Sequence, residues 1–142
     1  MVAYYNGGMQ LEAYLYFDGR CEEALEFYKR ALGGEYEANR FAGSPMEAHV
    51  GPEWAQKILH ATFKGDGFTF MGSDRAPGEG GDIKPNVALS LATDQARAET
   101  VFQALADGGK IVMPLGPSFW SGSFGMVTDR FGIEWMVSGH SA

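Results

Sequence analysis

The sequence predicts an α+β fold in which one module, a strand followed by a helix and three more strands (βαβββ), occurs twice. Two amphipathic helical patterns, at residues 20–32 and about 94–107, each follow a strand-like run and precede three others. Gly34 and Gly109 complete Gly-Gly pairs at the ends of these patterns. The same spacing separates two further identical pairs, Phe27/Phe102 and Ala31/Ala106. Repeated order and spacing therefore indicate an internal duplication.

The first module is assigned to residues 9–74. A strand-like run ends at Phe17, and the helix that follows has one apolar stripe, acidic residues in its first turn and basic residues in its last. Residues 35–42, 57–65 and 68–74 are strand-like, and Gly65-Asp66-Gly67 indicates a hairpin turn. Residues 1–8 lack periodicity and are expected to be a disordered lead-in or an expression remnant, outside a single folded domain of residues 9–142.

The second module is assigned to residues 85–140, after a Gly- and Pro-rich linker at about 75–84. Its helix has a buried face predicted from Ala98, Val101, Phe102 and Leu105, with Thr93 or Asp94 as N-cap. Strand-like runs cover residues 86–93, 110–116, 123–129 and 133–139. A half-sheet of four strands cannot bury its face alone, so we expect the two halves to pack together.

Composition excludes several classes of function. The chain has 142 residues, a formal net charge of -7 and eleven scattered basic residues, so nothing favours a nucleic-acid partner. Polar residues or glycines interrupt every apolar stretch before the roughly 18 residues that a membrane helix needs. The single cysteine, Cys21, cannot form an internal disulfide. We therefore expect a cytoplasmic protein with no membrane partner.

Three segments carry a resemblance to a known family: EEALEFYKRALGGE after the first strand, KILHATF in the middle, and MPLGPSFWSGSFGMVTDRFGIEWMV near the end. Together with the repeated βαβββ order, they resemble the PhnB-like branch of the vicinal oxygen chelate superfamily. That superfamily includes glyoxalases, extradiol dioxygenases and bleomycin resistance proteins. The resemblance covers residues 10–139 and implies curled mixed half-sheets around a cleft, the glyoxalase/bleomycin-resistance fold.

The resemblance also implies where a divalent metal would bind, with one ligand from each of four strands. The corresponding positions hold Leu11 (or Ala13 in the alternative register), His60, Asn86 and Met136. Only the histidine is a good ligand, because aliphatic side chains have no lone pair and a thioether suits soft metals. We therefore expect no metal cofactor, although a shifted divalent-metal site that uses His60 and Glu134 remains an alternative.

His60 and Glu134 are the candidate catalytic residues. The histidine lies among apolar neighbours and is interpreted as a strand histidine with a hydrogen bond in the core, a base in the cleft, or a metal ligand. Glu134 lies two residues before Met136, so strand alternation places both on one face. His49 and His140 are expected to be solvated.

Candidate ligand-binding residues include two aromatic groups. Phe119 and Trp120 lie in a Gly/Ser-rich turn that would hold them over a cleft, with core or dimer packing as the alternative. Trp54 is interpreted as a loop anchor or as a cap on the pocket. The resemblance adds Asn86 and Met136 to this set.

Three further features receive structural interpretations. Met113, Met126 and Met136 are predicted to fill the core. Cys21 is expected to be an idle, half-buried thiol, with a lowered pKa at the helix start as the alternative. The segment DRFG at residues 129–132 is predicted to be the turn that sets the register of the last hairpin, with Gly132 in an unusual conformation.

These observations favour a homodimeric protein that binds a small molecule in an aromatic cleft, without metal chemistry. The competing hypothesis is a lyase, isomerase or transferase that uses His60 as a base and Glu134 as a second acid/base or metal ligand. A third is a dimeric scaffold without a ligand. The identity of the ligand lies beyond the sequence.

Overall fold

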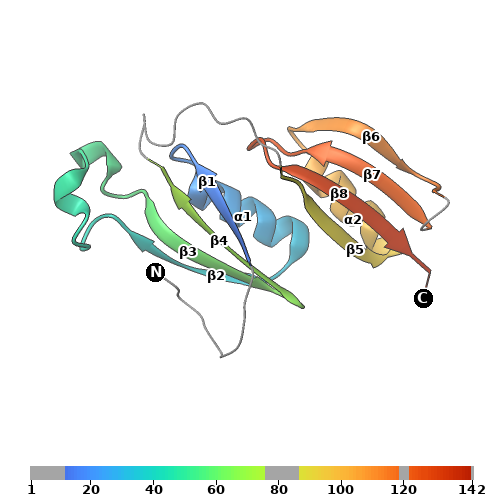
Figure 1. The fold of residues 1–142 in the computed structure, drawn as a ribbon, viewed down its shortest axis with the longest axis horizontal. Helices are drawn as coiled ribbons and strands as arrows, with labels where there is room; N and C mark the ends of the chain where they lie inside the picture. Colours follow the sequence, from blue (N-terminus) through green and yellow to red (C-terminus); the bar gives the residue numbers. More distant parts are fainter. Residues whose placement is uncertain (1–11, 76–86, 119–121, 142) are drawn as a thin grey trace. The chain divides into compact units, whose positions relative to one another are not determined.

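The computed structural model describes residues 12–75, 87–118 and 122–141, and the chain divides into two compact units, Met1–Asp82 and Ile83–Ala142. Each unit contains one of the two predicted modules (Figure 1). The lead-in expected at residues 1–8 lies outside the described residues, and so does the expected linker apart from Arg75.

Module one forms a mixed four-stranded sheet with one helix. Strand β1 pairs in parallel with β4, β4 pairs antiparallel with β3, and β3 pairs antiparallel with β2. Two short 3-10 helices occupy the long β2–β3 connection. The elements are β1 (Ala13–Phe17), α1 (Cys21–Leu32), β2 (Glu35–Arg40), η1 (Glu47–His49), η2 (Pro52–Trp54), β3 (Ile58–Gly65) and β4 (Phe68–Asp74).

Module two repeats this topology. Its sheet has the order β5-β8-β7-β6, again with the first strand parallel to the last and the other pairs antiparallel. The elements are β5 (Leu89–Asp94), α2 (Gln95–Ala106), β6 (Lys110–Gly116), β7 (Ser123–Thr128) and β8 (Glu134–His140). The predicted α+β class and the duplication of the βαβββ module are confirmed.

The repeated glycine pairs have a structural reason. Gly33 and Gly108 have nearly the same positive φ, 75° and 76°. A Cβ atom at Gly34 would lie 2.6 Å from the carbonyl oxygen of Lys64 in β3, and one at Gly109 would collide with the carbonyl oxygen of Thr128 in β7. Both pairs therefore reverse the chain after a helix and bring it against the equivalent strand, where no side chain fits.

Aromatic side chains fill the space between α1 and its sheet. Tyr28 of α1 meets Phe70 of β4 edge to face, with ring centroids 5.9 Å apart, and Phe70 stacks on Phe63 of β3 at 4.8 Å. Because side chains alternate along a strand, Phe63 and Phe70 define the face covered by α1. We call the opposite side of each sheet its open face.

Two glycines of the module-two sheet lie close to α2. A Cβ atom at Gly125 would lie 2.8 Å from the ring of Phe102 in α2, and one at Gly139 would lie 3.0 Å from Cβ of Ala98. The remaining buried residues of this layer are Val101 and Leu105 from α2 and Val127, Trp135 and Val137 from the sheet. The predicted buried face of the second helix is confirmed.

The two helices begin differently. Asp94 accepts a hydrogen bond from the backbone N–H of Arg97 at 2.9 Å and is the N-cap of α2, which settles the predicted choice in its favour. Arg20, the residue before α1, makes no capping bond. Instead, the carboxylate of Asp74 in β4 accepts from the N–H groups of Gly19 and Cys21 at 3.0 and 2.8 Å.

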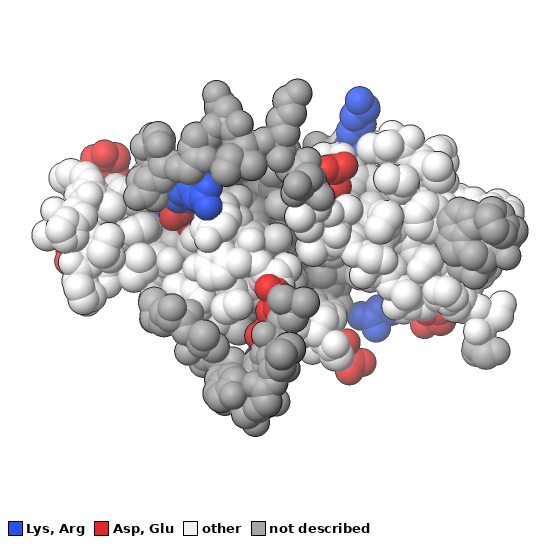
Figure 2. Space-filling view, in the orientation of Figure 1, with Lys and Arg blue, Asp and Glu red and all other residues white. Residues whose placement is uncertain are grey.

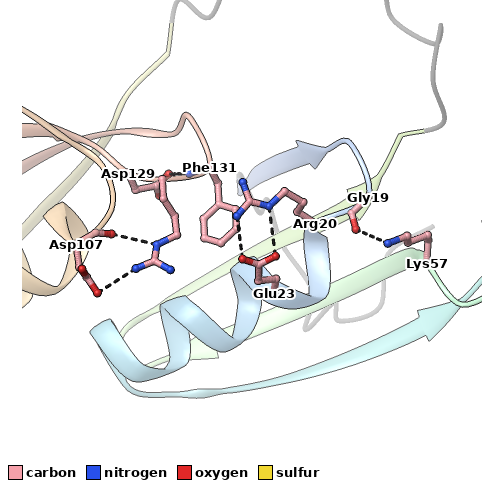
Figure 3. Close-up of polar contacts among 8 residues, drawn as sticks. Gly19, Arg20, Glu23, Lys57, Asp107, Asp129 and Phe131 are labelled. Carbon is pink, nitrogen blue, oxygen red and sulfur yellow. Dashed lines mark hydrogen bonds and ion pairs between the residues drawn. The ribbon is translucent and has the colours of Figure 1, made fainter.

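The predicted turn at residues 129–132 is confirmed. The Asp129 carboxylate accepts hydrogen bonds from the N–H groups of Phe131 and Ile133 and from the indole of Trp135, and Gly132 has φ of +88°. Arg130 pairs instead with Asp107, so the charges of this segment support the hairpin (Figure 3). The aspartate therefore fixes the register of β7 and β8.

None of the described helices is long and apolar enough to cross a membrane. On the face of the molecule shown in Figure 2, lysine and arginine side chains occur as separate spots and not as a stripe.

Candidate functional site

Polar and aromatic side chains gather on the open face of module one. The strand register aligns Tyr14 of β1 with Met71 of β4, and Met71 with Thr62 of β3. One step along the strands, Tyr16 is aligned with Ser73. His60 lies two residues before Thr62, on the same face. Side chains from three strands, β1, β3 and β4, therefore share one surface.

His60 is the best-buried polar group of this face, with 3% of its surface exposed. Its Nδ1 atom lies 3.0 Å from the hydroxyl of Tyr14, and its Nε2 atom lies 3.4 Å from the hydroxyl of Thr62. The rings of His60 and Tyr14 are 5.6 Å apart. Both ring nitrogens therefore have a hydroxyl partner, although the side chain points away from the core under α1.

Burial makes this pair uncharged. It lowers the pKa of His60 from its ordinary value, because a cation loses hydration there. It raises the pKa of Tyr14, and a hydrogen bond from Ser73 offsets only part of that effect. A neutral imidazole offers one donor and one acceptor, and a neutral phenol offers the same. Near neutral pH both side chains are therefore uncharged, and either one can donate the hydrogen bond between them.

A cation lies beside this pair. The guanidinium of Arg75 sits 3.7 Å from the ring centroid of Tyr16, and the rings of Tyr16 and Tyr14 are 5.1 Å apart. Tyr16 is 52% exposed, whereas Arg75 and Tyr14 are half-buried. The open face thus runs from a half-buried cation to a buried neutral histidine across two tyrosine rings.

Sequence reasoning found His60 and missed the residues around it. The signal for Tyr14 and Tyr16 was present, because two tyrosines spaced by two in a strand share a face. Thr62 follows His60 by the same rule. Arg75 carried no signal, because it stands at the start of what the sequence presents as a linker.

The module-two candidates lie on its open face. Glu134 and Met136 alternate with the buried Trp135 and Val137, so they share the side of β8 away from α2, as predicted. Met136 is aligned with Met126 of β7.

A row of methionines crosses this sheet, because Met126 is in turn aligned with Met113 of β6. The prediction that these methionines fill the core is wrong. Met113 is 46% exposed, and Met126 and Met136 are half-buried on the open face. Side-chain type alone misled the prediction, since a flexible thioether suits a core and a binding surface equally.

Three predicted ligand contacts, Asn86, Phe119 and Trp120, lie outside the described residues, as does Leu11 at the first of the four metal positions. Trp54 is described, and it ends η2 with its ring 3.5 Å from the position of a Cβ atom at Gly19. Its indole Nε1 is buried and has no hydrogen-bond partner among the described residues. It therefore packs against the β1–α1 connection.

The single cysteine and the other two histidines lie in no described reactive site. Cys21 is fully buried, not half-buried as expected, and burial raises the pKa of its thiol, which contradicts the alternative of a lowered value. His49 is exposed in η1. His140, which we expected in the tail, is the last residue of β8, where it is exposed and bonds to Ser138.

The described residues do not supply a donor set for a divalent metal. Within 12–75, 87–118 and 122–141, no three His, Cys, Asp or Glu side chains gather closely enough to hold an ion. The partners of His60 are the hydroxyls of Tyr14 and Thr62, whereas such metals favour imidazole, thiolate or carboxylate ligands.

The sequence model of the glyoxalase/bleomycin resistance protein/dioxygenase superfamily matches residues 10–137 of the chain. The chain belongs to this superfamily. The family prediction made from the sequence motifs is confirmed. The glyoxalase superfamily assignment agrees with the two βαβββ modules described above.

Relatives refine the position of the chain within the glyoxalase superfamily. Protein YjdN of Escherichia coli is 34% identical over 141 residues, which cover 92% of this chain and 95% of YjdN. The crystal structure of protein PA1353 from Pseudomonas aeruginosa is 42% identical, with a TM-score of 0.84 and coverage of 95% and 100% of the two chains. A structure from Bacillus cereus, described as a putative 3-demethylubiquinone-9 3-methyltransferase and PhnB protein, is 29% identical. Its TM-score is 0.76, with 92% of this chain and 98% of that chain covered.

Proposed function

We propose that the protein binds a small molecule on the open face of module one, with Tyr14 and His60 as its polar contacts. The observation that carries this proposal is the neutral, hydrogen-bonded pair on the side of the sheet away from α1. Membership of a superfamily with bleomycin resistance proteins supports a binding role.

Thr62 and Tyr14 hold the imidazole in one orientation, so little side-chain entropy is lost when a ligand binds. The tyrosine rings supply flat apolar area with a polar end, which suits an unsaturated ligand. The proposed ligand takes over one hydrogen bond of the pair and lies against the rings of Tyr14 and Tyr16.

The test is a metabolite screen by thermal shift on the full chain and on two variants. Tyr14→Phe removes the hydroxyl that meets His60, whereas Tyr36→Phe removes one that bonds Glu26 on the α1 side of the same sheet. A ligand at 100 times its dissociation constant stabilises by about 2.7 kcal/mol. We expect hits that shift the parent and Tyr36→Phe but shift Tyr14→Phe much less. Hits that shift all three proteins equally would place the ligand elsewhere.

Catalysis is a second candidate function, favoured by the direct contact of His60 with Tyr14. A neutral histidine bonded to a phenol can take a proton from a bound molecule while the phenol donates one to a developing oxyanion. Incubation of a screening hit in D2O with the parent protein would then exchange an acidic C–H of that ligand, detected by mass spectrometry. His60→Gln should abolish the exchange. Binding without any exchange would leave the binding role alone.

The other residues that the sequence predicted to bind a ligand or to act in catalysis are tested by substitution. They are Trp54, Asn86, Phe119, Trp120, Glu134 and Met136. Each is replaced by alanine and compared with the parent for affinity to the same hit. A loss confined to some of them would outline the ligand, and no loss at any of them would restrict contact to the tyrosines and His60.

We also propose a homodimer that covers β6. This strand lies at the edge of its sheet, and Ile111, Val112 and Met113 are 46–55% exposed. Exposed apolar edge strands pair with other chains unless they are covered. Light scattering after size exclusion should give twice the chain mass, and Val112→Lys should reduce it to the chain mass. A parent protein with the chain mass would contradict the dimer.

A further inference from the structure

The stacked position of Arg75 determines which part of its side chain is available to a ligand. Its guanidinium uses one flat face against the ring of Tyr16, at 3.7 Å. The N–H groups of a guanidinium point outward in its plane, so stacking leaves them accessible. Among the described residues, no carboxylate pairs with this guanidinium. By contrast, Arg20 and Arg40 of module one each bond a glutamate.

Stacking also holds the guanidinium of Arg75 in place, whereas nothing holds the side chain of a solvated arginine in one position. The cation–π contact orients the planar fork before any ligand arrives, so less side-chain entropy is lost when both in-plane donors are used. A bidentate fork of this kind matches the two oxygens of a carboxylate or a phosphate.

The position of Arg75 relative to the neutral pair sets the shape of the ligand. Successive ring contacts connect the guanidinium to Tyr16, Tyr16 to Tyr14, and Tyr14 to His60. Charge therefore lies at the exposed end of the face and uncharged donors at the buried end. Burial at His60 disfavours a charged ligand group there, because no opposite charge compensates the lost hydration.

From these observations we propose that the ligand is a small organic oxyanion, whose carboxylate or phosphate binds Arg75. Its unsaturated body lies against Tyr16 and Tyr14, and an uncharged polar group reaches His60. This inference rests on the proposed function and adds the charge class of the ligand, which nothing in the family assignment specifies. The same oxyanion fork fits both carboxylate and phosphate, so the experiment compares the two.

The probes share a ring and differ in charge: 4-hydroxybenzoate, 4-hydroxyphenyl phosphate and the neutral 4-hydroxybenzamide. Binding to the full chain is measured by NMR, from shifts of tyrosine ring and imidazole signals up to millimolar concentration. We expect one or both anions to bind and the amide to bind at least tenfold more weakly. A preference between the two anions identifies the head group.

Two charge-matched variants test the role of Arg75. Arg75→Gln removes the cation on the open face, whereas Arg30→Gln removes an exposed cation from α1, on the other side of the sheet. We expect Arg75→Gln to weaken anion binding by about tenfold to a hundredfold, the effect of one charge-assisted contact. Arg30→Gln should leave it nearly unchanged. Arg75→Lys keeps the charge but not the fork, and should recover only part of the affinity.

The outcomes separate this inference from the proposed function. If the amide binds as well as the anions and Tyr14→Phe abolishes both, the binding site stands and the oxyanion inference is wrong. Equal loss in Arg75→Gln and Arg30→Gln would show only a general charge effect and also overturn it. If no probe perturbs the tyrosine and imidazole signals, an oxyanion is not the ligand class, while the metabolite screen still decides the binding function.

Discussion

The two modules share a topology but anchor their helices and hairpins by different means. In module one, the buried Asp74 accepts three backbone hydrogen bonds from Gly19, Cys21 and Ile58, segments that lie far from it in sequence. In module two, Asp94 caps α2 three residues away, and Asp129 bonds within its own turn. One repeated fold is therefore held by a long-range carboxylate in one copy and by local ones in the other.

The open faces differ as well. Module one presents tyrosines, a buried histidine and a stacked arginine, whereas module two presents a row of methionines beside Glu134. The two modules share the strand order and the glycines that end the helices, because both are needed for the fold. The open faces are not constrained by helix packing, so their chemistry can differ.

Loss of the long-range carboxylate should have the largest effect on stability. Asp74→Ala leaves three N–H groups without a partner, two of them in buried hydrogen bonds, and we expect a loss of about 3–5 kcal/mol in the free energy of unfolding, measured in urea. Asp94→Ala removes a local cap and should cost about 1 kcal/mol. Equal losses would show that the distinction between long-range and local anchoring has no energetic meaning.

The next largest difference in stability between the modules should come from the packing of each helix on its sheet. Gly125→Ala places a methyl group 2.8 Å from Phe102 and 2.9 Å from the backbone of Leu115, and should cost about 1–3 kcal/mol. Gly72→Ala in module one meets its nearest neighbour, the carbonyl oxygen of Leu15, at 3.3 Å and should therefore cost less than Gly125→Ala. Thermal unfolding of both variants checks this. A larger loss at Gly72 would contradict the closer approach of α2 to its sheet.

A smaller effect should appear in the pH dependence of stability. The pKa of His60 is lower in the folded state than in the unfolded chain, so the unfolded chain binds more protons between the two values. Stability from this group is therefore complete above pH of about 6.5 and falls as the pH drops towards the lowered folded pKa. His60→Gln should flatten that slope in urea titrations at several pH values. An unchanged slope would assign the acid sensitivity to other groups.

The two modules should differ least in the stability that their surface ion pairs contribute. Arg20 pairs with Glu23 on α1 and Arg130 with Asp107 beyond α2, both with exposed partners (Figure 3). Arg20→Gln and Arg130→Gln should each cost less than about 1 kcal/mol, and high salt should shrink both effects. A loss above that value for Arg130→Gln would mean that its bond to the carbonyl of Asp107 holds the β7–β8 turn.

The sequence by itself determined the order of strands and helices, the duplicated module, the glycine pairs, the turn at Asp129 and the family. Those features depend on periodicity and turn chemistry within a few residues, which local sequence encodes. It also identified His60, and it leaves the cleft between the half-sheets, the ligand and the roles of Asn86, Phe119 and Trp120 as predictions.

Only the tertiary structure decided which residues meet across strands. Tyr14 and His60 are separated by 46 positions, and their contact requires the β1-β4-β3 order and its register. The same holds for Asp74 at the start of α1 and for the methionine row. Alternation along one strand tells which face a side chain shares but not which strand lies beside it. Sheet order depends on burial summed over the whole module, so no local pattern contains it.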